Sequence, residues 1–186
     1  INWAVTKQPI IMGILVSVLM GMILTLPISS AALAIILNLS GLAGGAATVG
    51  CCANMVGFAV ASFKENGISG LISQGLGTSM LQVPNIMKKP IIWLPAIIAS
   101  AILGPISTVV LHMTNNASGA GMGTAGLVGQ LMTWQDMSES ENGVVLIIKI
   151  ILLHFILLGV IAWVTSYIMR KKGLIKDGDM KLESSI

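Results

Sequence analysis

Long apolar stretches alternate with short polar segments along this chain, and their lengths predict its elements. A helix that crosses a bilayer needs about 20 mainly apolar residues. Four stretches approach or exceed that length, namely 9–26, 41–63, 90–112 and 143–169. Pro9 suits the first turn of a helix, whereas Pro95 and Pro105 are expected to kink the third stretch. The pattern therefore predicts four membrane-spanning helices.

Three shorter stretches of apolar and small residues lie between these spans, at 28–39, 67–82 and 117–133. Segments of this length more often re-enter the membrane or lie along it than cross it. We therefore predict an all-α integral membrane domain over 1–169, with about four spans plus short re-entrant or interfacial helices. A flexible cytoplasmic tail is expected over 170–186. Because the chain opens at Ile1 without a signal pattern, we expect it to be the C-terminal part of a longer protein.

Composition agrees with a membrane location. The chain is 55% hydrophobic and 9% charged, with a mean hydropathy of +0.92, whereas soluble domains carry roughly 25% charged residues. Nine of its ten basic residues flank the apolar stretches and form no patch with aromatic residues, which argues against nucleic-acid binding. Adjacent Cys51 and Cys52 indicate small packing residues in a helix. The sequence contains no metal-ligand spacing, Ser/His/Asp set or phosphate loop, so no metal, cofactor or self-contained catalytic site is predicted.

The charges also predict an orientation. If four spans alternate, one side of the membrane receives most of the basic residues, namely Lys7, Lys64, Lys88, Lys89, Arg170, Lys171 and Lys172. Asp136, Glu139 and Glu141 fall on the other side. The positive-inside rule then places both chain ends in the cytoplasm. It makes 64–89 a cytoplasmic loop, either a plain interfacial segment or a gate or docking surface.

Internal similarity suggests two repeats. Lys7-Gln-Pro-Ile-Ile recurs as Lys88-Lys-Pro-Ile-Ile, and Pro27-Ile-Ser recurs as Pro105-Ile-Ser. Asn38-Leu-Ser-Gly recurs as Asn116-Ala-Ser-Gly. We predict parallel repeats over about 7–63 and 88–169, because both begin with lysine on the same side. A second self-match relates Gly75-Leu-Gly-Thr to Gly121-Met-Gly-Thr, and we interpret it as chance or as convergent re-entrant chemistry.

The glycine-rich stretches have two interpretations. Gly41/Gly45 and Gly119/Gly123 fit the G-x-x-x-G pattern of closely packed helices. Their polar neighbours suggest a solute site instead, since neutral amides and hydroxyls bind a polyhydroxylated ligand without a charge to desolvate. The candidate substrate-binding residues are Asn38, Ser40, Asn54, His112, Asn115, Asn116, Ser118, Thr124 and Gln130. The G-x-G-x-x-G spacing that begins at Gly121 reflects glycine content, because a dinucleotide loop needs a preceding strand.

Two ionisable residues lie inside the fourth stretch. His154 is a functional hypothesis by default at membrane depth, although a neutral histidine bonded to a neighbouring helix is common. Lys149 is close enough to the acidic loop to extend its ammonium group out of the membrane.

The runs that begin at Gly41, Lys88 and Asn115 (GLAGG, KKPIIWLPA and NNASGAGMGTAG) resemble membrane C subunits (EIIC) of the phosphoenolpyruvate-dependent sugar phosphotransferase system. They resemble most the branch that contains a regulator of perfringolysin production. The resemblance covers roughly 7–170. It implies a homodimeric permease of the bacterial plasma membrane that binds a sugar-like solute, while a cytoplasmic B subunit supplies the phosphoryl group. The chain would then be at most the membrane subunit of a protein-phosphohistidine–sugar phosphotransferase.

One family motif is absent, and alternatives follow from that. The chain lacks the Gly-Ile-Thr-Glu stretch that supplies an intramembrane glutamate in better-understood sugar permeases. Sugar-site residues are therefore not carried over. Besides a permease, the sequence is compatible with a non-transporting membrane regulator on the same scaffold, or with a channel for small solutes or ions.

Overall fold

The computed structural model describes residues 1–182, and within them the chain is helical, with one isolated β-bridge between Gly41 and Asn115. In chain order the elements are α1 (Asn2–Lys7), α2 (Pro9–Thr25), α3 (Ser30–Ile36), α4 (Gly41–Ala61), α5 (Phe63–Ile72), the π turn η1 (Ser73–Gly77), the 3-10 turn η2 (Ser79–Gln82), α6 (Val83–Lys88), the 3-10 turn η3 (Pro90–Trp93), α7 (Leu94–Pro105), the π turn η4 (Ile106–Val110), α8 (Ala117–Ala120), the 3-10 turn η5 (Ala125–Leu127), α9 (Val128–Met137), α10 (Gly143–Ile151), the π turn η6 (Leu152–Ile156) and α11 (Leu157–Lys171).

Within residues 1–182, three continuous helices are long and apolar enough to cross a membrane. They are α4, the helix Pro90–Val110 built from η3, α7 and η4, and the helix Gly143–Lys171 built from α10, η6 and α11. The first predicted span corresponds to α2, which is apolar but has 17 residues. The three short stretches form short helices and turns. The protein is thus an all-α membrane protein, as the sequence predicts.

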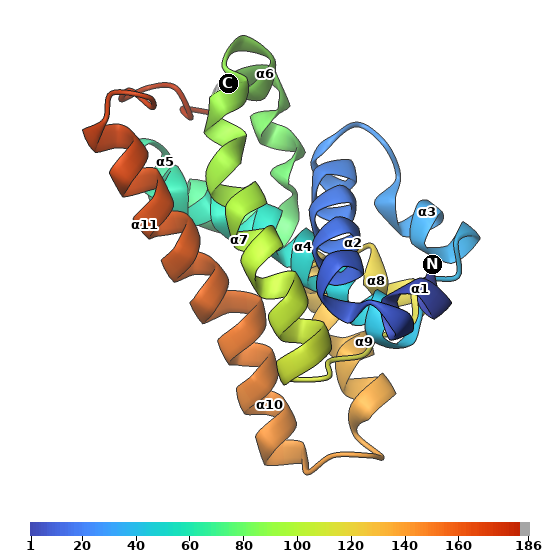
Figure 1. Cartoon of the computed structure of the whole chain (residues 1–186). Helices are drawn as coiled ribbons and strands as arrows, with labels where there is room; N and C mark the ends of the chain where they lie inside the picture. Colours follow the sequence, from blue (N-terminus) through green and yellow to red (C-terminus); the bar gives the residue numbers. More distant parts are fainter. Residues whose placement is uncertain (183–186) are drawn as a thin grey trace.

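Helix α4 lies at the centre, between α2, α7 and α11 (Figure 1). The apolar part of α4 is 94% buried inside the protein, whereas that of Gly143–Lys171 is 33% buried. Helix α4 is therefore surrounded by protein, and the last span has much of its surface facing outward. Small residues allow this packing. A Cβ on Gly50 would lie 1.8 Å from the Ser17 carbonyl oxygen, and one on Gly45 would lie 2.0 Å from that of Met113. At Gly45 the close neighbour is the irregular backbone of Met113 and Thr114, not a second helix.

The directions of the helices differ from the prediction. Thr108, at the end of the α7 span, donates to the carbonyl of Pro9 at the start of α2 (2.8 Å). Ser17 of α2 donates to the carbonyl of Ser100 (2.8 Å), so α2 and α7 are antiparallel. The helices that follow the two Lys-x-Pro-Ile-Ile motifs therefore run in opposite directions, and the predicted parallel arrangement is wrong.

The physical reason is the return segment 26–40. Helices α2 and α4 run the same way, since Thr25 at the end of α2 donates to Asn54 near the end of α4 (3.2 Å). The chain must return between them, and it does so through α3 and its flanking turns. This segment is too short for a spanning helix, so counting spans alone reverses the direction of α2.

The two chain ends consequently lie at opposite ends of the bundle. Asn2 donates to the carbonyl of Asn38, just before α4 (2.8 Å). Lys64, just after α4, pairs with Asp177 of the tail (2.7 Å). The expected placement of both ends on one side is therefore wrong, and Lys7 is separated from Lys64 and Arg170. We call the end that carries Lys64 and Arg170 the basic end, and the end that carries Asp136 and Glu141 the acidic end.

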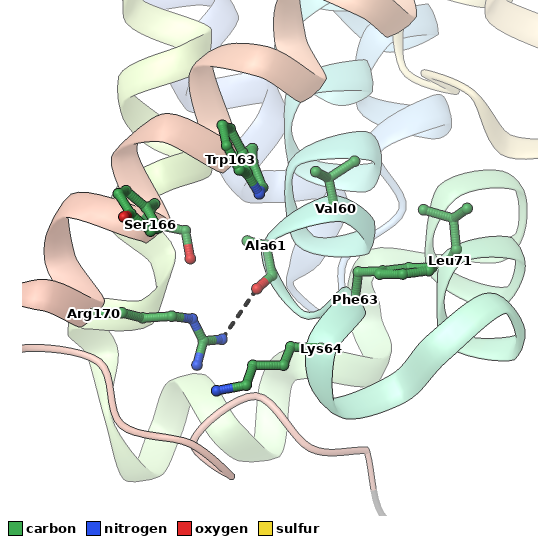
Figure 2. A pocket seen from close by; sticks show the side chains of 9 residues that line it. Val60, Ala61, Phe63, Lys64, Leu71, Trp163, Ser166 and Arg170 are labelled. Carbon is green, nitrogen blue, oxygen red and sulfur yellow. Dashed lines mark hydrogen bonds between the residues drawn. The ribbon is translucent and has the colours of Figure 1, made fainter.

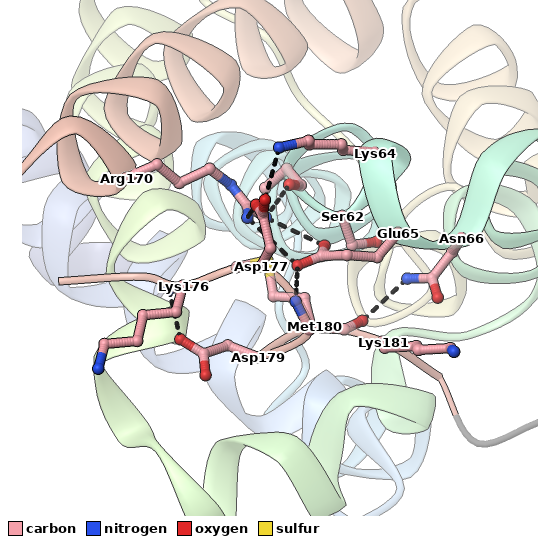
Figure 3. A network of polar contacts seen from close by, with 12 residues as sticks. Ser62, Lys64, Glu65, Asn66, Arg170, Lys176, Asp177, Asp179, Met180 and Lys181 are labelled. Atoms are coloured by element: carbon pink, nitrogen blue, oxygen red, sulfur yellow. Dashed lines mark hydrogen bonds and ion pairs between the residues drawn. The ribbon is translucent and has the colours of Figure 1, made fainter. Parts of the chain in front are cut away.

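The tail after α11 is docked, which corrects the expectation of a flexible segment for residues 172–182. Ile175 and Met180 are buried in a core cluster with Phe58 and Trp93. The carbonyl of Met180 accepts hydrogen bonds from the Asn66 and Gln82 amides (2.9 and 3.0 Å). Figure 3 shows this part of the tail crossing the basic end of the bundle. The last four residues of the predicted tail, 183–186, lie outside the described residues.

Candidate functional site

A first hairpin dips into the bundle from the basic end. Its two arms are held together at this end by the tail, because the Asn66 and Gln82 side chains both donate to the carbonyl of Met180. Between them the chain reaches Gly75, where a Cβ would lie 3.4 Å from that of Ala59 in α4. Gly67, with φ of 58°, breaks α5 and redirects the chain. The segment 62–82 is therefore a broken-helix hairpin, and we call it hairpin 1.

A second hairpin enters from the acidic end. Its arms are joined where the Asn115 amide donates to the carbonyl of Gly129 (3.1 Å). Between these residues the chain reaches Gly123, where a Cβ would lie 2.8 Å from the Cys51 carbonyl carbon of α4. Gly123 and Gly126 have φ of 55° and 53°, a conformation that glycine adopts at least cost. We call the segment 115–129 hairpin 2.

The tips of the two hairpins meet beside α4. The buried hydroxyl of Thr124 donates to the carbonyl of Gly75 and lies 3.5 Å from the sulfur of Met55. A cavity of about 210 Å³ adjoins this contact, lined by Ser29, Ser30, Met55, Gly77, Thr78 and Gly121, among others. Irregular backbone at membrane depth is tolerated where it is buried in protein or lines a cavity. Ser29, Ser30 and Thr78 place neutral hydroxyl-bearing residues in the cavity lining.

A satisfied polar network holds hairpin 1 against three helices. Asn54 of α4 accepts hydrogen bonds from the Trp93 indole (2.7 Å) and the Thr25 hydroxyl (3.2 Å). Thr25 also bonds to Ser79, at the return arm of hairpin 1 (2.8 Å). All four side chains are buried. Because these oxygens and donors already have partners, we assign the network a positioning role.

A second polar pair leaves hydrogen-bonding capacity unused. The Gln130 amide nitrogen lies 3.3 Å from His154 Nδ1 and 3.2 Å from Cys52 Sγ. Both Gln130 and His154 are buried. Among residues 1–182, neither Gln130 Oε1 nor His154 Nε2 has a hydrogen-bond partner. Buried polar groups are usually satisfied, so this pair is able to accept from and donate to a hydroxyl group.

The nine residues predicted from sequence separate into two groups. Asn54, Thr124 and Gln130 are buried in the middle of the bundle. The remaining six belong to the acidic end, and they are Asn38, Ser40, His112, Asn115, Asn116 and Ser118. The structure therefore does not bring all nine into one site.

The group at the acidic end has several local contacts. Asn115 is buried and bonds to Thr48 (2.7 Å), while its backbone amide donates to the carbonyl of Gly41 (3.2 Å). The start of α4 at Gly41 thus lies against Asn115, the residue that precedes the second Asn-x-Ser-Gly stretch. Asn116 caps α8 by accepting from the Gly119 amide (3.0 Å). Asn38 and His112 are exposed and have positive φ.

Sequence reasoning missed the cavity residues Ser29, Ser30 and Thr78. One signal pointed to their neighbourhood, namely the match between Gly75-Leu-Gly-Thr and Gly121-Met-Gly-Thr. The structure brings these two stretches together at the hairpin tips. The sequence is compatible with a packing or a functional role for His154, and the lack of a partner for its Nε2 within residues 1–182 is the observation that bears on function.

Comparison with known protein families identifies the family to which this chain belongs. Residues 1–182 match the family described as "Phosphotransferase system, EIIC". No curated protein and no solved structure matches the chain. The family match covers nearly the whole chain, and the helices are those of a membrane protein. The chain therefore belongs to the EIIC family of the phosphotransferase system, whose members are membrane permease components.

Proposed function

We propose that this chain binds a neutral, sugar-like solute where the tips of hairpins 1 and 2 meet, and that the solute crosses the membrane at this point. One observation supports the proposal above all others: the Thr124–Gly75 contact joins hairpins from opposite ends of the bundle beside a cavity. Transporters commonly place their substrates near the bilayer midplane between discontinuous helices. Gln130 Oε1 and His154 Nε2, which lack partners among the residues described, provide a second polar contact for hydroxyl groups.

We propose that the halves α4–hairpin 1 and α7–hairpin 2 form an inverted pair. Hairpin 1 opens toward the basic end and hairpin 2 toward the acidic end, so withdrawing one hairpin at a time exposes the cavity to one side at a time. The shared Gly-x-Gly-Thr sequence at both tips supports this pairing. Inverted repeats of this kind underlie alternating access in several transporter folds.

We place the basic end in the cytoplasm of a bacterial cell, because loops rich in lysine and arginine remain on that side. A cytoplasmic B subunit that carries the phosphoryl group would then approach Lys64, Lys89 and Arg170. The permease itself contributes solute binding and orientation, and a homodimer is the assembly expected from the family resemblance. The six residues at the acidic end, including Asn38 and Asn116, remain candidates for the outer part of the pathway.

A second candidate function, that of a membrane regulator, is supported by the contacts of the docked tail. The docked tail holds both arms of hairpin 1 through Met180, so a signal at the tail would reach the hairpin directly. This favours a membrane regulator over a channel. A regulator would bind solute without moving it, whereas a channel would conduct without any phosphoryl donor.

Uptake into liposomes tests the proposal, with and without the cytoplasmic donor proteins, over a panel of labelled neutral sugars and polyols. Ala31 lines the cavity, and Ala31→Leu is expected to abolish uptake by filling it. Ala32→Leu is the matched control, since Ala32 is exposed on the same short helix. Equal uptake by both variants would overturn the cavity assignment. Solute binding without uptake would favour the regulator, and donor-independent flux would favour the channel.

A further inference from the structure

An amphipathic groove lies at the basic end, away from the hairpin tips. It runs between the end of α4, the start of α5 and helix α11, and has a volume of about 640 Å³ (Figure 2). Val60, Leu71 and Trp163 give it mainly apolar walls, and Lys64 and Arg170 lie at one end. Trp163 is 55% exposed on α11, so the groove opens on the outer surface of the bundle, where lipid would contact it.

A buried hydroxyl in this groove has no hydrogen-bond partner in the described part of the chain. Ser166 lines the groove on the α11 wall, between Trp163 and Arg170 in the sequence. Its side chain is 2% exposed, and its Oγ has no hydrogen-bond partner within residues 1–182. A serine in a helix commonly bonds back to the preceding turn, and this one does not. It is therefore available to donate to an acceptor oxygen of a ligand in the groove.

A second cavity of about 590 Å³ continues the groove at its charged end. It shares Lys64, Tyr167 and Arg170 with the groove and adds Lys171 and Lys176. Lys171 Nζ lies 4.8 Å from the centre of the Tyr167 ring. An apolar compartment thus adjoins a compartment with four cationic side chains.

The protein places one of its own carboxylates in the cationic compartment. Asp177 lies 2.7 Å from Lys64 Nζ and 3.3 Å from Arg170 Nη1 (Figure 3). Its side chain is 69% exposed, so it is held by these two contacts and not by burial. Glu65 pairs with Arg170 from the other side (3.0 Å). A third carboxylate, Asp179, accepts from the backbone amide of Lys176 (2.6 Å). The four cations of the compartment still exceed these three carboxylates, and Asp177 occupies the position an external anion would take.

We propose that this groove binds one anionic phospholipid, with an acyl chain along Val60, Leu71 and Trp163 and the phosphate between Lys64, Arg170 and Lys171. The headgroup oxygens displace Asp177, and a glycerol-ester oxygen accepts from Ser166. Three features select this occupant. The groove is apolar at membrane depth, its charge is positive at the interface, and aromatic residues mark the boundary between the two. A soluble anion would leave the apolar compartment empty.

Native mass spectrometry of the purified chain tests the proposal with two lipids of identical acyl chains, phosphatidylglycerol and phosphatidylcholine. We expect preferential retention of phosphatidylglycerol. Lys64→Ala is expected to lower its affinity by about five-fold, the effect of about one interfacial charge. Asp177→Asn is expected to raise the affinity, because it removes the competing carboxylate. Lys181→Ala is the matched control, since Lys181 is an exposed tail lysine outside both cavities.

The unfolding temperature in detergent identifies a misfolded variant. If Lys64→Ala fails to fold, Asp177→Asn still tests the phospholipid site, because unfolding cannot produce a gain in lipid affinity. Equal retention of the two lipids by the wild-type chain would overturn the proposal. It would also be overturned if Lys64→Ala, Asp177→Asn and Lys181→Ala all bound phosphatidylglycerol as the wild type does.

Discussion

The hydroxyl of Thr124 donates a hydrogen bond to the carbonyl of Gly75, which lies 49 positions earlier in the sequence. The two residues belong to hairpins that enter the bundle from opposite ends. Their contact closes the space between the tips, because Thr124 is fully buried there. The structure thus describes a state in which both hairpins are inserted. Any movement that withdraws one of them must break this bond.

Thr124→Val should remove that bond while conserving volume. It leaves the buried Gly75 carbonyl without its donor, which costs about 1–3 kcal/mol. We expect lower thermal stability in detergent and altered solute uptake. Thr133→Val is the matched control, because Thr133 is equally buried but bonds within its own helix to Gly129 (2.8 Å). Similar uptake by the two variants would contradict a special role for the hairpin contact.

Gly50→Ala should separate α2 from α4. The added Cβ would lie 1.8 Å from the backbone oxygen of Ser17, so the helices must move apart. Overpacking of this kind costs about 1–3 kcal/mol. Gly159→Ala is the contrasting change, because its nearest neighbour would be Val60 at 3.6 Å, and alanine favours the helix by about 0.5–1 kcal/mol. Thermal unfolding of both variants measures the difference, and equal melting temperatures would contradict the close approach.

Element positions could be predicted from the sequence, but their directions could not. Apolar length gave the bounds of the four main helices to within two residues at each end, because long apolar stretches leave few alternatives. Direction depends on whether a short segment such as 26–40 returns across the bundle. Residues 28–39 carry no charge and too few apolar positions to mark a span, so their return could not be inferred from composition.

The kinds of side chain at the candidate site could be predicted from the sequence, but the position of the site in the fold could be predicted only in part. Neutral amides and hydroxyls near glycines were identified, and Thr124 and Gln130 do lie near the centre. The repeat anchored on Asn38 and Asn116 carried more sequence identity than the Gly-x-Gly-Thr match, yet the latter marks the hairpin tips. Four identical or similar residues are too few to distinguish from chance in a glycine-rich chain. Tertiary contacts were needed to choose between the two matches.

Opposite placement of the chain ends should be measurable by labelling. Trp3 and Met87 are 74% and 76% exposed, and they belong to the acidic and the basic end. In sealed vesicles of one orientation, an impermeant maleimide should label Trp3→Cys or Met87→Cys, and only one of them. Native Cys51 and Cys52 are fully buried, so they should remain unlabelled in the folded protein. Labelling of both introduced cysteines from the same side would contradict the antiparallel arrangement of α2 and α7.

His154→Leu should separate stability from function. His154 is buried with an unpartnered Nε2 among the described residues, so leucine removes a polar group that no bond compensates. The same change leaves one buried N–H of Gln130 without its Nδ1 acceptor (3.3 Å), which costs about 1–3 kcal/mol. Because the two effects oppose each other, we expect a small change in melting temperature together with reduced solute binding or uptake. Gln130 retains its contact with Cys52 (3.2 Å), so the neighbouring amide stays in place. A variant that is markedly less stable but transports normally would assign His154 a packing role.

Acidification should release the docked tail. Hydrogen bonding and charge from Lys64 lower the pKa of Asp177 below its ordinary value of 3.8. For Asp179, burial acts to raise the pKa, but the hydrogen bonds from Lys89 and the Lys176 backbone outweigh it, and the pKa is lowered as well. A carboxyl group whose pKa is lower in the docked state stabilises that state above pH about 3.8. The stabilisation is lost as the pH falls through the lowered values.

A fluorophore on Lys181→Cys should therefore show high anisotropy at neutral pH and a drop below pH about 4. The double variant Asp177→Asn, Asp179→Asn should start with lower anisotropy and show a smaller change. Constant anisotropy in the parent protein across this range would mean that the buried side chains of Ile175 and Met180 hold the tail without help from the ion pairs.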